Sequence, residues 1–98
     1  MGYSGKTANI LIESRLMAAM AGDVTAYFDL GMAYSSGSGG IGVDLIEAHK
    51  WFNLAALGGI AGAQECRAEI ADEMSAREIA EAQRQARAWL STSIARAA

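Results

Sequence analysis

The sequence predicts an all-α fold in which about five short antiparallel helices stack into a solenoid. The chain has no proline and few clusters of β-branched residues, which favours helix throughout. Apolar residues also recur at helical spacing between short glycine-containing turns. Finally, residues 18–22 (AAMAG) are echoed by residues 55–59 (AALGG), an offset of 37 positions (55 − 18). A period of that length with two helices in each unit is typical of helical solenoids.

The first two predicted helices are separated by a turn at Gly22. Residues 1–6 are expected to form a loose arm, and the first helix to run over about 8–21, with Thr7 as its N-cap and Gly22 as its stop. Apolar side chains cover more than half of its circumference, which indicates contact with two neighbours or a face offered to another molecule. The second helix is expected over about 25–35.

A glycine-rich turn over residues 37–42 (GSGGIG) leads into the third predicted helix. Its four glycines permit positive φ angles. Asp44 with Glu47 forms an Asp-x-x-Glu version of the capping box, and Gly58 with Gly59 ends the helix. The buried face of this helix is expected to consist of Ala48, Trp51, Phe52, Ala55 and Ala56.

The last two predicted helices cover about 61–73 and, after a second capping box at Ser75 and Glu78, the chain to about residue 95. The apolar stripe of the fourth helix consists of Ala63, Cys66, Ile70 and Met74. That of the fifth consists of Ile79, Ala82, Ala86, Leu90 and Ile94, with Trp89 beside it. Residues 1–98 are therefore expected to form one helical-repeat domain, with a partial unit over 8–21, a clear unit over 25–59 and a degenerate terminal pair or cap over 61–95.

The clear unit resembles the Sel-1-like repeats, a subclass of the tetratricopeptide-type solenoids. The residues that carry the resemblance are Ala26, Leu30, Gly31, Tyr34, Gly37, Gly39, Val43, Asp44, Ala48, Trp51, Ala55, Ala56, Gly59 and Ala63. The glycine turn is about one residue longer than is usual in that family, and the frequent proline of the family is absent. Only weaker echoes of the motif extend over the rest of the chain.

This resemblance implies right-handed stacking of antiparallel helix pairs, with a concave groove lined mainly by the first helix of each pair. It also implies a role as an adaptor or scaffold that holds proteins in larger assemblies. The motif residues themselves are expected to be structural. Tyr34 and Trp51 are expected to meet in the core across the helix pair, and Gly31 to permit the close approach of the two helices.

Composition and charge exclude several classes of function. The net charge of −3 and the pI of about 5.0 leave no electrostatic footprint for nucleic acid, and the arginines near the C-terminus alternate with glutamates as on a solvated face. One cysteine excludes an internal disulfide. No signal peptide is apparent and no apolar run approaches the roughly 20 residues that a membrane span needs, so a cytoplasmic protein without membrane insertion is expected.

No convergent set of polar residues predicts catalysis, a metal or a cofactor. His49 is the only histidine and is expected at the surface, since a metal site needs three or four ligands. Cys66 lies on an apolar stripe and is expected to act as a small hydrophobic residue. The spacing Gly37-x-Gly39-x-x-Gly42 satisfies the dinucleotide fingerprint, but it lies between two helices and indicates a turn.

Residues outside the structural pattern are the candidates for partner binding. They are Tyr27, Phe28, Met32 and Ser35 on the second helix, and Gln64 and Arg67 on the fourth. Exposed aromatic and methionine side chains offer a partner large contact area at modest cost in entropy. The alternative is that Phe28 or Met32 packs on the first helix.

These observations favour a non-enzymatic module that binds a helix or an extended segment of another protein, as an adaptor or an accessory subunit of a larger complex. The acidic charge favours a partner with basic patches. The alternative is self-association, in which the apolar first helix and Trp89 pair with a second copy to form a homodimer. An enzyme would instead need a deep pocket with two or more titratable groups.

Overall fold

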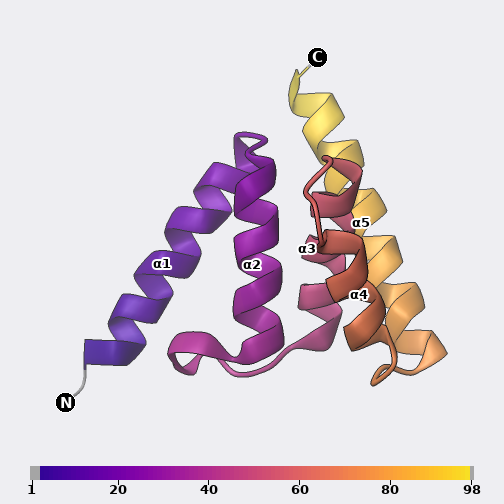
Figure 1. Cartoon of the computed structure of the whole chain (residues 1–98). Helices are drawn as coiled ribbons and strands as arrows, with labels where there is room; N and C mark the ends of the chain where they lie inside the picture. The colour runs from indigo at the N-terminus through magenta and orange to yellow at the C-terminus, as the bar shows by residue number, and fades with distance from the viewer. Residues whose placement is uncertain (1–2, 98) are drawn as a thin grey trace.

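The described part of the chain folds into five α-helices and one short 3₁₀-helix (Figure 1). The computed structural model describes the backbone of residues 3–97 and the side chains of residues 11–38 and 40–92. In chain order the elements are α1 (Tyr3–Met20), α2 (Val24–Ser36), the 3₁₀-helix η1 (Ser38–Gly40), α3 (Leu45–Leu57), α4 (Ala63–Ala71) and α5 (Ala76–Ala97). The described backbone contains no strand, so the predicted all-α fold of about five helices is confirmed.

Helix α1 begins earlier than the sequence predicts. The loose arm predicted over residues 1–6 is wrong from Tyr3 onward, where the backbone is already helical, and residues 1–2 lie outside the described residues. Only Gly5 opposes helix in this segment, and one glycine costs a helix only about 1 kcal/mol. This cost is small enough for residues 3–6 to form the first turn of α1.

The two echoed segments of the sequence fold alike. At the end of α1, Gly22 has a φ of 90°, its N–H donates to the Ala19 carbonyl, and the Asp23 N–H donates to the Ala18 carbonyl. At the end of α3, Gly59 has a φ of 87° and donates to the Ala56 carbonyl, and the next N–H donates to the Ala55 carbonyl. Both are Schellman motifs, in which a left-handed glycine lets the chain turn back. The two segments, 37 positions apart, thus share their backbone conformation as well as their sequence.

Helices α2 and α3 form a closely packed pair joined by the glycine-rich turn. A Cβ added to Gly31 would lie 2.5 Å from the ring of Phe52, so the absence of a side chain at residue 31 permits this approach, as predicted. Gly37 ends α2 in the left-handed conformation, with a φ of 69°. The N–H of Asp44 then donates to the Tyr34 carbonyl at 2.9 Å, which ties the start of α3 to the last turn of α2.

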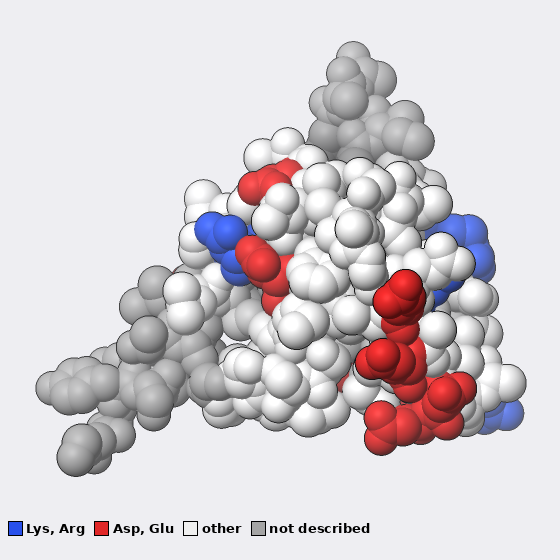
Figure 2. All heavy atoms as spheres, in the orientation of Figure 1, with Lys and Arg blue, Asp and Glu red and all other residues white. Residues whose placement is uncertain are grey.

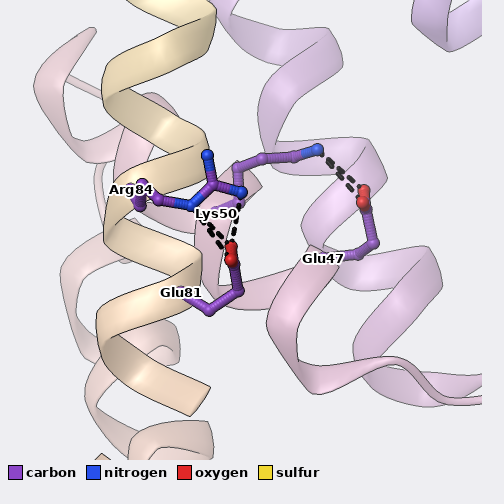
Figure 3. Close-up of polar contacts among 4 residues, drawn as sticks. All are labelled: Glu47, Lys50, Glu81 and Arg84. Carbon is purple, nitrogen blue, oxygen red and sulfur yellow. Dashed lines mark hydrogen bonds and ion pairs between the residues drawn. The ribbon is translucent and has the colours of Figure 1, made fainter. Parts of the chain in front are cut away.

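The two predicted capping boxes differ. Ser75 and Glu78 exchange both hydrogen bonds at the start of α5, which confirms the second box. At the start of α3 only half of the box forms, because Asp44 accepts from the Glu47 N–H but the Glu47 carboxylate turns away. It accepts instead from the indole N–H of Trp51 at 2.9 Å. It also accepts from the Lys50 ammonium at 3.1 Å (Figure 3).

Three aromatic rings from three helices form the centre of the core. Trp51 of α3 is 1% exposed; it stacks on Tyr27 of α2 with ring centroids 5.8 Å apart and meets Trp89 of α5 edge-on at 4.9 Å. The ring partners of Trp51 are thus Tyr27 and Trp89. Tyr34 is half-buried and packs against the core cluster that includes Trp51.

Helix α3 is the central element, since it packs against α2, α4 and α5, whereas α1 packs against α2 and η1 (Figure 1). Ala82 and Ala86 of α5 are fully buried, as predicted, and Trp89 and Leu90 are half-buried against the same core. Ile94 lies outside the described side chains. No helix in the described part of the chain is both long enough and apolar enough to cross a membrane.

Candidate partner-binding surface

The residues predicted to bind a partner on α2 do not form one exposed surface. Tyr27 is only 7% exposed, so its assignment to a groove is wrong. Its ring packs against both Trp51 and Trp89, and its hydroxyl accepts a 3.3 Å hydrogen bond from the Trp89 indole. Phe28 is half-buried, with its ring centroid 5.7 Å from that of Phe52. Both aromatic side chains are therefore used in packing the chain itself.

Met32 is the most exposed of the candidates on α2. Its residue is 46% exposed, and its carbonyl accepts hydrogen bonds from the hydroxyls of Ser35 and Ser36. Ser35 is half-buried. The hydroxyl of Ser35 is thus occupied by a local bond of the helix C-terminus, whereas the apolar side chain of Met32 remains open to contact.

Of the two candidates on α4, one is exposed and the other is used in packing the chain itself. Gln64 is exposed, but Arg67 is half-buried and donates to the Asn53 amide oxygen of α3. This bond joins two helices that the sequence separates by 14 positions. Arg67 therefore has a structural role in holding α4 on α3, which the sequence pattern alone does not reveal.

A hollow of about 560 Å³ lies between the end of α3 and the first two turns of α4. It is lined by Ala56, residues 59–62, and Gln64, Glu65 and Ala68. Gln64 is the one predicted binding residue among these lining residues. Most of its lining residues are alanine or glycine. These residues are too small to fill the space between the end of α3 and α4.

Acidic side chains gather beside this hollow (Figure 2). Glu65, Glu69, Asp72 and Glu73 are all exposed, and their spacing of four, three and one positions places them along one side of α4 and its final turn. We call these four residues the acidic ridge. Sequence reasoning missed it as a feature, although the i, i+4, i+7 spacing of the carboxylates was the signal that could have found it.

The other charged side chains near the C-terminus form the solvated face that the sequence predicts. Arg77, Arg84 and Arg87 are exposed, and Arg84 bonds to the Glu81 carboxylate at 2.7 Å (Figure 3). The hydrogen bond from Arg84 lowers the pKa of Glu81. This pair is accessible to solvent and adds little stability.

His49 is buried, which corrects the predicted surface position. It is 3% exposed, and its Nδ1 has no hydrogen-bond partner among the described residues. Burial lowers the pKa of the imidazole, and the nearby positive charge of Arg67 lowers it further. The histidine is therefore neutral in the folded chain at neutral pH.

Cys66 is half-buried on α4. Burial raises the pKa of its thiol, and the negative charges of Glu69 and Glu65 raise it further. A thiol in this environment stays protonated at neutral pH, whereas a nucleophilic cysteine needs a lowered pKa.

Five of the eleven residues predicted to be structural are buried. Leu30, Gly31, Ala48, Trp51 and Ala55 lie in the interior, and Asp44 caps α3. Gly37 and Gly59 have the left-handed backbone that their turns need, Gly39 lies in η1, and Ala56 is half-buried at the hollow. Among the described residues no three His, Cys, Asp or Glu side chains cluster as metal ligands would.

Comparison of the chain with models of protein families, with curated proteins and with solved structures finds no match. The interpretation of the surface therefore depends on its own geometry and chemistry.

Proposed function

We propose that the chain is a non-enzymatic helical-repeat module that binds another protein, as an adaptor or an accessory subunit of a larger complex in the cytoplasm. The observation that carries this proposal is the exposure of Met32 on α2 together with the open hollow at Gln64 on α4. Helix α2 pairs with α3, and α4 packs on the same helix α3. An exposed methionine and a hollow lined mostly by small residues suit contact with a protein partner.

The resemblance to Sel-1-like repeats belongs to the same proposal. Its support is that motif residues on both helices of the clear unit are buried and that the echoed segments end α1 and α3 with the same motif. In a solenoid each unit buries its apolar face against its neighbour, and the surface left over is used for binding.

The module is proposed to act by contact and not by chemistry. Cys66 and His49 are its two side chains best suited to nucleophilic or acid–base roles. The pKa of the thiol is raised, and the imidazole is enclosed in the core. Neither environment suits a reactive group that must reach a substrate.

Self-association is the second candidate, and a specific observation favours it. Helix α1 exposes Leu11, Met17 and Met20 by 60%, 72% and 51%. These side chains could pair with a second copy. Trp89, in contrast, is engaged with Tyr27 and Trp51, so a homodimer would depend on α1.

The experiment that tests the proposal is affinity capture from an extract of the native cells, with mass spectrometry of the bound proteins. One stoichiometric partner that survives moderate salt is the expected result. Recovery of the bait alone, with a dimeric mass in light scattering that Met17→Ala reduces to the monomer, would replace the proposal with the homodimer.

A further inference from the structure

We propose that the hollow beside α4 and the acidic ridge together form the docking site for a basic amphipathic helix of another protein. This inference rests on the proposed function, and it adds the location of the site and the chemistry of the partner. The hollow leaves room for an anchoring side chain, it is continuous with the ridge, and the ridge carboxylates have no ion-pair partner among the described residues.

The hollow fits an apolar anchor from a partner. Ala56 and Ile60 lie on the α3 side, and Ala68 lies on α4 opposite them. Both Ala56 and Ile60 are half-buried, whereas Ala68 is exposed, so the hollow is open to solvent at α4. Its volume of about 560 Å³ leaves room for an apolar side chain of a partner to rest in this open depression.

The hollow and the acidic ridge are continuous at Glu65, which belongs to both. Glu69 follows one helical turn later, and Asp72 and Glu73 follow at the next turn. A partner helix that lies along α4 with lysine or arginine at i and i+4 would match this spacing, because both helices rise by 1.5 Å per residue.

The ridge carboxylates have no internal counter-charge in the part of the chain that the structure describes. Asp29, Glu47 and Glu81 each pair with a basic side chain, namely Arg15, Lys50 and Arg84. None of the four ridge residues is in such a pair. Four neighbouring carboxylates repel one another, and a basic partner would relieve that repulsion while speeding association.

A foreign partner fits this surface better than a second copy. The exposed basic side chains of α5 include Arg77, Arg84 and Arg87, but Arg84 is already bound to Glu81. Each copy also carries a net charge of −3, so two copies repel one another. The occupant is therefore expected to be a basic helix that the chain itself does not supply.

The test is selection of displayed random peptides, long enough for about four helical turns, on the purified full chain. Two variants address the site: Glu69→Lys reverses a ridge charge, and Ala68→Trp fills the hollow. Two matched controls alter exposed positions elsewhere: Glu13→Lys on α1 and Ala80→Trp on α5. Circular dichroism establishes that all four variants remain helical.

The expected result is a selected set rich in lysine and arginine with an apolar anchor, whose affinity falls about tenfold or more in both site variants and changes less than about twofold in both controls. Peptides without basic enrichment, or binding that both site variants retain, would overturn the inference. So would a dimer of the chain that dissociates in Glu69→Lys. If a partner captured from extract binds both site variants normally, the docking site is wrong while the proposed function stands.

Discussion

The ring of Phe52 on α3 occupies the space that a side chain at Gly31 of α2 would need. An added Cβ would meet Cδ1 at 2.5 Å and Cε1 at 2.6 Å, and Phe52 is 1% exposed with little freedom to move. Alanine instead of glycine in a helix normally adds about 1 kcal/mol of stability. Here the overlap reverses that gain.

Gly31→Ala is therefore expected to destabilise the chain by about 1–3 kcal/mol, as overpacked cores do. Chemical denaturation followed by circular dichroism measures the change. Phe52→Leu provides the control, because in the double variant the smaller side chain should recover part of the loss caused by Gly31→Ala. A Gly31→Ala variant that is more stable than the wild type would refute the close contact.

Trp51→Ala tests the aromatic centre of the core. Removal of this buried ring should cost roughly 3–5 kcal/mol, a large fraction of the stability of a small domain. The variant should lose most of its helical circular dichroism at room temperature. Leu57→Ala, at a position 67% exposed on the same helix, is the control and should unfold like the wild type. Retention of a wild-type transition by Trp51→Ala would contradict the packing.

Tyr27 is predicted to matter for folding and not for partner contact. Tyr27→Phe keeps the stack on Trp51 but removes the oxygen that accepts from Trp89, so a loss of about 1 kcal/mol is expected. Tyr27→Ala also removes the ring and should cost several times more. Thermal unfolding of the two variants separates these effects, and equal stability of Tyr27→Ala and wild type would show that the ring is not part of the core.

The burial of His49 predicts a pH dependence of stability. Its pKa is lowered from the ordinary value of 6.5 in the folded chain, so the unfolded chain binds a proton more readily. The free energy of unfolding should therefore be constant above about pH 7.5 and fall as the pH drops through 6.5, by up to about 1.4 kcal/mol per pH unit until the folded pKa is reached.

Urea denaturation of wild type and His49→Leu between about pH 7.5 and pH 5.5 measures this dependence. Leucine does not titrate, so the difference in stability between the two proteins should change across this range. A constant difference would mean that His49 titrates alike in the folded and unfolded chains.

Sequence reasoning located the helices because the signals for their ends are local. Gly22 and Gly59 adopt the left-handed backbone that ends α1 and α3, and Asp44 and Ser75 cap α3 and α5 through bonds to residues three positions away. Such contacts can be inferred from spacing alone. The close approach at Gly31 was also predicted, although its partner, Phe52, was not.

The burial of side chains on a helix was harder to predict, since it depends on distant segments. Trp89, which covers Tyr27, is 62 positions away in the sequence. His49 is enclosed partly because α4 packs back on α3, where Arg67 bonds to Asn53. The spacing of residues within α2 or α3 does not reveal these long-range contacts. The sequence therefore predicted Tyr27 and His49 at the surface.

The most direct test of the central claim is capture of the native partner by Met32→Ala/Gln64→Ala, which truncates exposed side chains on α2 and α4. Met17→Ala and Glu13→Ala on α1 form the matched control. We predict that the double variant keeps its helical circular dichroism and captures at least about tenfold less partner at equal bait concentration, while the control captures as the wild type does. Undiminished capture by the double variant would contradict the claim that α2 and α4 contact the partner.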